Sequence, residues 1–526
     1  MVIFVFVLLL LAVATRFYKL GQVPHGMTWD EAAIGYNGFA IFTTHRDEWL
    51  QKMPISFRSF GDYKAPLAIY VEAASTAIFG LSLFAVRLPF AVSGVLFVAS
   101  FGYFCWLLFS YSKSQTILTV IGLLFAATSP WHLHYSRIGF ESGLALTLIM
   151  LGLTGLEHLS VSTKTKLSQT GSVLLFLSVI TLVASLYTYH SAKIFLPFFG
   201  LFLALRYSKM MRQNIQLCLI AGILGVGWLA PLVVDTFFGP GGARASVLIT
   251  SQGLSVLEFT WRLLENTGLH LQPGFLLLGK VDSLSHGAGS YGVLSVPVFI
   301  LGTTSVCWYL FKRKQLSNEL KRSIKLAIVW ILAGLLPAAL SSEIVPHTNR
   351  ALLALPGFLI LALTGIDLVL SSQSRFTTDL LKRMFIGLIV LSELILFIYF
   401  WQSYFARFAS TSAADFQDGY LEVFAEAQKY ERGLDGYPEV SEVVVSSQYG
   451  QPYIYVLFIR QTSPIAYQGG SLRKYLFLDQ VTVADLDRKN ILLIGTPNSD
   501  LPLDKATKII YGSNGQPRFL LYYTGT

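Results

Sequence analysis

The chain has 526 residues, of which 53% are hydrophobic and 13% are charged, and its mean hydropathy is +0.57. A composition this apolar excludes an ordinary soluble globular protein and indicates a polytopic membrane protein. The net charge of +9 would suggest a nucleic-acid partner only if it gathered on a folded polar face, whereas much of it stands in short connections between hydrophobic runs. We therefore expect a membrane partner and no nucleic acid.

Eleven hydrophobic runs have roughly the length of a membrane-spanning helix. A further run, 66–80, would rise only about 22 Å as a helix, which is less than the roughly 30 Å of the hydrocarbon core. We expect this run to be a helix on the outer surface of the membrane. The eleven predicted spans lie at 2–15, 88–110, 116–130, 142–158, 171–187, 192–205, 215–237, 291–311, 324–342, 351–371 and 384–402.

Lysine and arginine recur in every second connection, and such connections face the cytoplasm. The first span has no leading positive charge, so we expect it to stay uncleaved, although Ala12-Val13-Ala14 resembles a signal-peptidase site. The protein is then expected in the plasma (inner) membrane, with the other connections outside. The basic residues used are Lys113, Lys164, Lys166, Arg206, Lys209, Arg212, Lys312, Arg313, Lys314, Lys321, Arg322, Lys325, Arg375, Lys382 and Arg383.

Hydrophobicity drops after the last span, which divides the chain into a transmembrane domain, 1–402, and a soluble extracytoplasmic α/β domain, 403–526. Long outer segments usually carry function or their own secondary structure. The outer segments are 16–87, 131–141, 238–290 and 343–350. In the soluble domain we expect a helix over 415–430 and β-rich runs at 443–445, 453–458, 491–494, 508–511 and 519–523.

Acidic residues near lipid are costly and therefore indicate function. Asp30 and Glu31 follow the first span, and Glu141 opens a later one. Glu31 has a simpler explanation, because Thr28 and Glu31 have the spacing of a capping box that starts a helix. Both roles are compatible, since a capped helix would hold Asp30 rigidly.

Basic residues in the same outer segments are candidates for binding phosphate. Lys64, beside Tyr63, directly precedes a helix started by Pro66, and it is either a phosphate ligand or a snorkelling anchor. Arg137 is either a ligand or a flank of the membrane interface. Arg350 follows His347 at the start of a span, where a guanidinium matches phosphate oxygens or serves as a topological stop.

Histidines and cysteines give little evidence of a metal site. His132, His134, His190, His286 and His347 have no firm ligand spacing, so no metal ligand is assigned and a need for a divalent metal stays open. The three cysteines, Cys105, Cys218 and Cys307, all fall in predicted spans, and we expect them to be packing residues.

The ordered motifs resemble those of bacterial members of glycosyltransferase family 39, relatives of protein O-mannosyltransferases and lipid A aminoarabinose transferases, all with the GT-C fold. The resemblance covers about residues 1–200 and 347–356. It departs at Glu141, where many relatives have aspartate, and at Ala65, where proline is common. The motifs are Trp29-Asp30-Glu31, Asp62-Tyr63-Lys64-Ala65-Pro66-Leu67, Arg87-Leu88-Pro89, Ser129-Pro130 and Tyr135-Ser136-Arg137 with Glu141.

The resemblance implies transfer of a sugar from a polyprenyl-phosphate donor to a protein, lipid or glycan hydroxyl on the outer face, with inversion and without a required cofactor. It implies Asp30 as general base with Glu31 as its acidic neighbour, and Lys64 near the donor phosphate. The predicted catalytic set is Asp30, Glu31 and Glu141, the phosphate-binding set is Lys64, Arg137 and Arg350, and the candidate substrate contacts are Tyr63, His190 and His347.

We expect Asp30 and Glu141 to share one water-accessible chamber. The glycine-rich stretch 239–244 fits a mobile roof or simple turns. A transporter or lipid flippase also needs many spans, but it would place ionisable groups at mid-membrane and repeat its halves, neither of which is evident. A binding protein anchored by eleven spans is the third alternative, although so many spans exceed what an anchor needs.

Overall fold

The computed structural model describes residues 1–162, 166–279, 286–287, 292–372 and 378–525. Lys164, Arg375 and parts of the outer segment 238–290 lie outside this description. The chain forms two compact units, one made of Met1–Tyr18 and Phe90–Gln402 and the other of Lys19–Pro89 and Ser403–Thr526. The first outer segment therefore belongs with the C-terminal residues, whereas the sequence grouped it with the spans.

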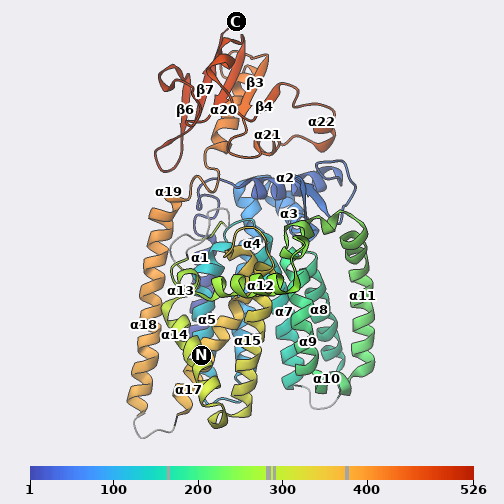
Figure 1. Cartoon of the computed structure of the whole chain (residues 1–526), viewed down its shortest axis with the longest axis vertical. Coiled ribbons are helices and arrows are strands. Elements are labelled where there is room, and N and C mark those ends of the chain that lie inside the picture. Colours follow the sequence, from blue (N-terminus) through green and yellow to red (C-terminus); the bar gives the residue numbers. More distant parts are fainter. Residues whose placement is uncertain (163–165, 280–285, 288–291, 373–377, 526) are drawn as a thin grey trace. The chain divides into compact units, whose positions relative to one another are not determined.

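The first unit consists of long apolar helices, and each of the eleven predicted spans is a helix (Figure 1). They are α1 (Val2–Phe17), α4 (Leu83–Leu108), α5 (Gln115–Thr128), α7 (Glu141–Ser162), α8 (Gln169–Leu186), α9 (His190–Arg206), α11 (Ile215–Phe238), α14 (Val296–Phe311), α15 (Asn318–Ala339), α17 (Leu355–Ser371) and α18 (Asp379–Ser403). The first residues of α4, up to Pro89, belong to the other unit.

Short helices connect or precede these spans. They are α6 (Pro130–Tyr135), α10 (Ser208–Gln213), η1 (Pro240–Val247), η2 (Ile249–Ser251), α12 (Val256–Leu271), α13 (Pro273–Leu276), η4 (Arg313–Gln315), α16 (Thr348–Ala351) and η5 (Leu352–Ala354).

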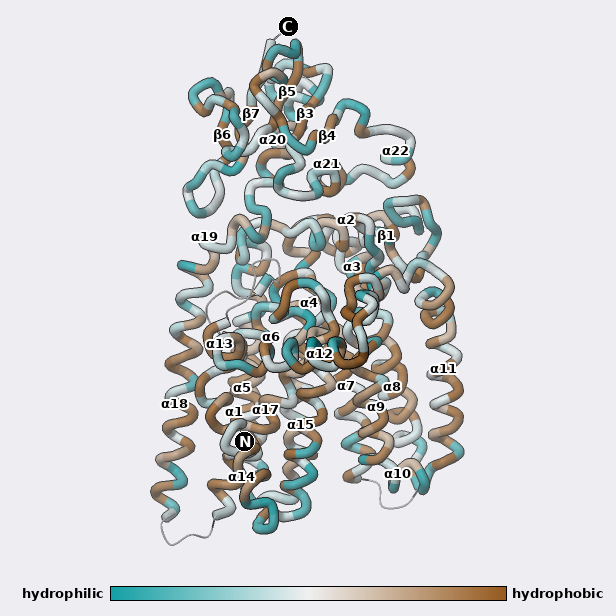
Figure 2. The backbone as a smooth tube through the Cα atoms, in the orientation of Figure 1, coloured by the Kyte–Doolittle hydropathy of each residue, from teal (hydrophilic) through white to brown (hydrophobic). Residues whose placement is uncertain are grey.

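Seven helices among the described residues are long and apolar enough to cross a membrane. Figure 2 shows apolar residues along most of the length of α8, α11 and α18. Only 11% of the apolar window of α11 and 22% of that of α18 is buried within the protein, so both present apolar side chains outward, as lipid-facing helices do. The chain is a polytopic helical membrane protein.

Small residues let the spanning helices approach closely. A Cβ at Gly334 of α15 would lie 2.5 Å from backbone atoms of Ala354, so α15 touches the start of α17 through its backbone. On α7, a Cβ at Gly152 or Gly155 would collide with Ser178 of α8. Packing of this kind is typical of helices in membranes, where no hydrophobic drive brings helices together.

The second unit is an α/β domain with a five-stranded mixed sheet of order β4-β3-β5-β7-β6. The strands β3 and β4 and the strands β3 and β5 are parallel, and β7 is antiparallel to β5 and β6. The strands are β3 (Glu442–Ser446), β4 (Tyr475–Leu478), β5 (Ile491–Gly495), β6 (Lys508–Tyr511) and β7 (Pro517–Tyr523).

The first outer segment adds two helices and a hairpin to this unit. They are α2 (Trp29–Thr44) and α3 (Pro66–Phe79), and the hairpin pairs β1 (Phe57–Ser59) with β2 (Asp62–Lys64). The C-terminal part of the unit contributes the helices η6 (Tyr404–Phe408), α19 (Ala409–Thr411), α20 (Tyr420–Arg432), α21 (Pro452–Arg460), α22 (Pro464–Gln468), η7 (Val483–Asp487) and η8 (Leu503–Lys505). The run 66–80 is thus a helix, as predicted.

The sheet has a core on each face, because alternate residues of a strand point to opposite sides. Val443 and Val445 pack in a large core with residues of α2, α20 and α21, while Val444 packs in a smaller core on the other face. Tyr36 of α2 donates a hydrogen bond to the carbonyl oxygen of Thr462 at 2.8 Å. The large core therefore joins α2 to the C-terminal sheet.

One strand prediction in this unit is wrong. Residues 453–458 form most of helix α21 instead of a strand. Pro452 occupies the first turn, which favours a helix start, and the aromatic and β-branched residues that suggested a strand serve here to fill the large core.

Candidate functional site

Asp30 is held in the first turn of α2 and forms an ion pair with Lys64. The Lys64 Nζ lies 2.5 Å from Asp30 Oδ1, and the side chains are 8% and 25% exposed respectively. Thr28 caps the helix by accepting from the Glu31 backbone N–H, and Glu31 accepts from the Thr28 N–H in return. The predicted capping box is present and fixes the backbone on both sides of Asp30.

Glu31 is fully buried and also pairs with Arg87. Arg87 Nε lies 2.8 Å from Glu31 Oε1, and Arg87 Nη2 lies 3.2 Å from Oε2. Arg87 donates further hydrogen bonds to the carbonyl oxygens of Leu20, Pro24 and Gly26. The two oxygens of Glu31 are thus engaged by the helix start and by Arg87, which is the geometry of a group that positions Asp30.

Lys64 is placed by the β1–β2 hairpin, in which it pairs with Phe57. Pro66 begins α3 two residues later, so the Lys64 backbone is fixed from both sides. Tyr63, the neighbouring candidate contact, is half-buried. The predicted base and one predicted phosphate ligand therefore meet in the second unit.

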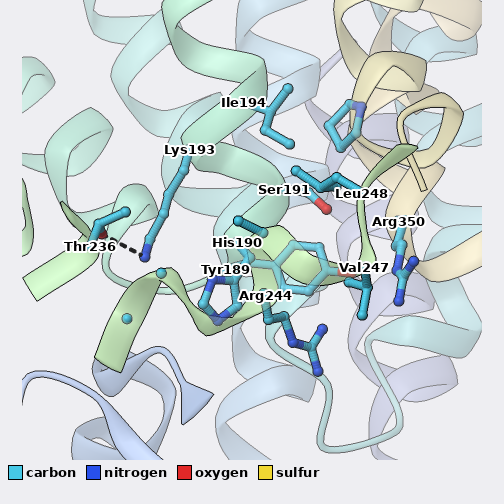
Figure 3. A pocket seen from close by; sticks show the side chains of 14 residues that line it. Tyr189, His190, Ser191, Lys193, Ile194, Thr236, Arg244, Val247, Leu248 and Arg350 are labelled. Carbon is cyan, nitrogen blue, oxygen red and sulfur yellow. Dashed lines mark hydrogen bonds between the residues drawn. The ribbon is translucent and has the colours of Figure 1, made fainter. Parts of the chain in front are cut away.

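The first unit contains a cavity of about 170 Å³ with basic side chains around it (Figure 3). His190 and Lys193 come from the first turn of α9, Arg244 from η1 and Arg350 from α16. Apolar residues supply the remaining wall, among them Ile194, Val247, Leu248 and Pro337. A concave site that combines apolar walls with several cations is suited to an anionic amphiphile.

Lys193 and Arg350 are each held by a neighbouring side chain. Lys193 Nζ lies 3.3 Å from Thr236 Oγ1. Arg350 contacts Ser341 Oγ, and its Nη2 lies 3.1 Å from Glu343 Oε2. Glu343 is half-exposed, so its carboxylate stays hydrated when Arg350 turns to another anion. Breaking this ion pair therefore costs little free energy.

Tyr189 links Glu141 to this cavity. The charges of Arg350, Arg244 and Glu141 all act on its hydroxyl group, whose pKa is raised mainly by burial. Tyr189 lines the cavity, while Glu141 begins α7 and is 9% exposed. Of the predicted residues, His190 and Arg350 line this cavity, and Glu141 acts on the Tyr189 hydroxyl group through its charge.

His347 lies directly before α16 and next to the same cations. Burial lowers its pKa well below the usual value, and the charge of Arg350 lowers it further. Its backbone N–H donates to His270 Nε2 at 3.0 Å. A neutral His347 beside Arg350 leaves the arginine as the charged member of this turn.

Arg137 has a different position from the one expected of a phosphate ligand. Its side chain is fully buried, and its Nη atoms donate to the carbonyl oxygens of Thr15, Arg16 and Tyr18 at the C-terminal end of α1. Arg16 in turn donates to the carbonyl oxygens of Ala126 and Ala127 near the end of α5. Each guanidinium is placed at the negative end of a helix dipole, which explains how two buried cations stand side by side.

Sequence reasoning missed Lys193 and Arg244 as cavity residues. Lys193 follows His190 by three residues on a helix, and this spacing puts both on one face. Arg244 stands in the glycine-rich stretch 239–244, whose sequence fits a mobile roof or turns, and it forms part of η1. Its position depends on the path of η1, for which the sequence carries no periodic signal.

Within the described parts of the chain, no group of three or more His, Cys, Asp or Glu side chains is placed to hold a metal ion. Cys105, Cys218 and Cys307 are free thiols in α4, α11 and α14. Asp30 and Glu141 belong to different compact units, so a chamber shared by both stays a prediction.

Comparison with solved structures identifies the fold. ArnT from Cupriavidus metallidurans bound to undecaprenyl phosphate aligns over 99% of this chain and 97% of its own, with a TM-score of 0.55 and 11% identity. The apo form of the oligosaccharyltransferase from Archaeoglobus fulgidus aligns over 94% of this chain and 69% of its own, with a TM-score of 0.51 and 12% identity. The oligosaccharyltransferase AglB from the same organism, in complex with an inhibitory peptide and a dolichol-phosphate, gives a TM-score of 0.50 at 13% identity, with the same coverage.

No protein-family model matches the chain, and no curated protein matches its sequence. The structural neighbours have the GT-C fold, which confirms the fold implied by the early motifs. Identities of 11–13% show the fold alone, and membership of family 39 stays a prediction.

Proposed function

We propose that the protein is a membrane glycosyltransferase that moves a sugar from a polyprenyl-phosphate donor to a hydroxyl acceptor. The observation that carries this proposal is the cavity of the first unit, where His190, Lys193, Arg244 and Arg350 stand among apolar walls. A lipid phosphate has the matching chemistry, since its head is anionic and its tail is apolar. The neighbouring ArnT and AglB structures hold undecaprenyl phosphate and dolichol-phosphate.

The cations serve the leaving group in this reaction. As the glycosidic bond lengthens, negative charge grows on the phosphate oxygens, so fixed cations stabilise the transition state more than the ground state. Arg244 and Arg350 are proposed as the main phosphate ligands because a guanidinium gives paired donors. A phosphate that is stabilised in this way leaves without a protonating acid.

Asp30 is proposed as the general base that takes the proton of the acceptor hydroxyl. Its carboxylate is 25% exposed and is oriented by Lys64, while Glu31 holds the helix start. General base catalysis contributes about 10²–10⁴-fold to the rate. A single displacement inverts the anomeric carbon and needs one such base. Glu141, Tyr63, His190 and His347 are proposed as contacts to the substrates.

The membrane placement follows the distribution of basic residues. We propose that the reaction occurs on the outer face of the plasma membrane, with the C-terminal residues on the same side. The acceptor is a hydroxyl of a protein, a lipid or a growing glycan. The alternative is a transporter or flippase of envelope glycans, which would bind the same lipid but break no glycosidic bond.

The test uses the purified protein and a panel of polyprenyl-phosphate sugars. We expect one donor to be consumed with release of polyprenyl phosphate, measured by mass spectrometry. Translocation of an intact donor in proteoliposomes, with no release of polyprenyl phosphate, would favour the flippase and contradict the proposed glycosyltransferase activity.

Binding of undecaprenyl phosphate tests the cavity separately. Arg244→Ala is expected to weaken binding at least about tenfold, since hydrogen bonds to charged groups are worth about 1.5–3 kcal/mol. Lys312→Ala removes an exposed cation at the end of α14 and is the matched control, expected to bind as the wild type does. If both variants bound undecaprenyl phosphate with equal affinity, the cavity would not be the site that binds the donor phosphate.

A further inference from the structure

Helix α12 in the first unit has an apolar stripe that no described part of the protein covers. Leu257, Trp261 and Leu264 are 79%, 71% and 61% exposed. They follow a spacing of four and three residues and therefore share one face of the helix. Leu271 is 40% exposed and lies seven residues, or about two helical turns, after Leu264, so it continues the same stripe.

The opposite face of α12 is buried and polar. Asn266 Nδ2 donates to the carbonyl oxygens of Ala339 at 2.8 Å and of Ser341 at 3.3 Å. His270 Nδ1 lies 2.7 Å from the Asn266 carbonyl oxygen, and its Nε2 accepts from the His347 backbone N–H. The buried face thus binds the segment that leads into Arg350, one of the cavity cations.

Charged residues line a third side of the helix. Glu258, Arg262 and Glu265 are exposed, and Arg262 Nη1 lies 3.6 Å from Glu265 Oε2. Successive residues of a helix are rotated by about 100° around its axis. On this basis the charged residues lie about 80–140° around the axis from Leu257, and the other residues of the apolar stripe lie within about 40° of it. A helix with an apolar side, a charged side and a buried side has the pattern of one that lies in a membrane interface.

We propose that α12 is seated in the lipid bilayer at the boundary of headgroups and acyl chains, and that this seat positions the segment from Ser341 to Arg350. The sixteen residues of α12 span only about 24 Å and carry an exposed charged side, Glu258, Arg262 and Glu265, so α12 does not cross the membrane. Figure 1 shows it lying across the long helices of its unit. Trp261 in the stripe suits this depth, since tryptophan favours the interface.

Phospholipid is the occupant that the surroundings favour. The stripe belongs to the unit that carries the spans, and α11 and α18 of that unit also expose apolar faces. A second copy of the chain would need a polar rim with matching partners, whereas lipid needs only an apolar stripe beside a charged side. Insertion then holds Asn266 and His270 against the Ser341–Arg350 segment, which makes both of them positioning residues.

The lipid contact is tested by fluorescence quenching in nanodiscs of phosphatidylcholine and phosphatidylglycerol. Bimane is attached at Leu264→Cys or, as the control, at Glu265→Cys, in a chain whose three cysteines are replaced. Lipids with a doxyl group near the headgroup end of the acyl chain should quench bimane at position 264 at least about twofold more than at position 265. Equal quenching at both positions, or protection of position 264 by a second copy, would overturn the proposal.

The positioning effect is tested by hydrogen exchange, which does not depend on any sugar transfer. Leu264→Ser and His270→Ala should each speed exchange in a peptide covering residues 341–352 by at least about fivefold. Glu265→Ser is the control and should leave that rate unchanged. Exchange at the wild-type rate in both test variants would show that α12 does not hold this segment, whatever the outcome for the proposed enzyme.

Discussion

Lys64 donates a hydrogen bond to Asp30 across 2.5 Å, so two residues expected to act at different ends of one reaction form an ion pair with each other. Asp30 keeps 25% of its side chain exposed, whereas Lys64 keeps 8%. The carboxylate is the more accessible partner, and the ammonium group fixes its direction. This arrangement suits a base whose carboxylate is oriented by Lys64.

Asp30→Asn is expected to lower the rate of sugar transfer by about 10²–10⁴-fold, because an amide cannot take the acceptor proton. The helix start should persist, since Thr28 and Glu31 make the capping box without the Asp30 side chain. The measurement is transfer from the consumed donor by purified protein, alongside its thermal midpoint.

Asp62→Asn is the matched control, because Asp62 is a half-buried acid on the same β1–β2 hairpin that carries Lys64. It should transfer at close to the wild-type rate. If Asp30→Asn behaved like this control, the base would have to be another residue.

Glu31→Gln is expected to destabilise the protein by about 3–5 kcal/mol, because it leaves the Arg87 guanidinium buried without its carboxylate. Arg87→Met also removes donors from the carbonyl oxygens of Leu20, Pro24 and Gly26, so the double variant is compared in a cycle: it should lose less stability than the sum of the two single variants. The free energy of unfolding is measured by denaturant titration in detergent. A single variant as stable as the wild type would show that the pair does not hold the helix start.

The sequence predicted the helical spans and the existence of an α/β domain, because long apolar runs and β-rich segments carry strong local signals. It also predicted the Thr28–Glu31 capping box, which depends on residues only three apart. It missed that α2 packs against α21 and bonds through Tyr36 to Thr462 just after that helix, since a contact between residues 426 positions apart leaves no local pattern.

The candidate site was predicted in part. His190 and Arg350, which the sequence offered as separate candidates at the starts of two spans, line one cavity. Arg137 was expected at a phosphate, but its bonds to carbonyl oxygens follow from where α1 happens to end. Whether an arginine faces a ligand or a helix end depends on tertiary packing, and the sequence does not record it.

Arg137→Met is therefore expected to lower stability rather than donor affinity. It removes hydrogen bonds to the carbonyl oxygens of Thr15, Arg16 and Tyr18, at about 1–3 kcal/mol for each group that becomes buried and unsatisfied. The thermal midpoint should fall by several degrees, while the surviving folded protein binds undecaprenyl phosphate with wild-type affinity. Arg244→Ala should show the reverse pattern, and loss of affinity without loss of stability in Arg137→Met would restore Arg137 as a ligand.

Glu48 should make the stability of the protein depend on pH. It lies in the connection after α2, 1% exposed, and burial raises its pKa from 4.5 to about 7. Between these values the unfolded chain loses the proton while the folded protein keeps it, so the free energy of unfolding falls as pH rises. The loss totals about 3 kcal/mol and is complete above about pH 7.

Glu48→Gln removes this titration, so the stability of the variant relative to the wild type should increase as pH rises from 5 to 8. Glu439→Gln is the matched control, because that side chain is 64% exposed and a group so accessible loses little solvation on folding. Thermal midpoints of the three proteins at pH 5, 6, 7 and 8 give the comparison. A difference between Glu48→Gln and the wild type that stays constant over this range would mean that Glu48 is already ionised in the folded protein at pH 5.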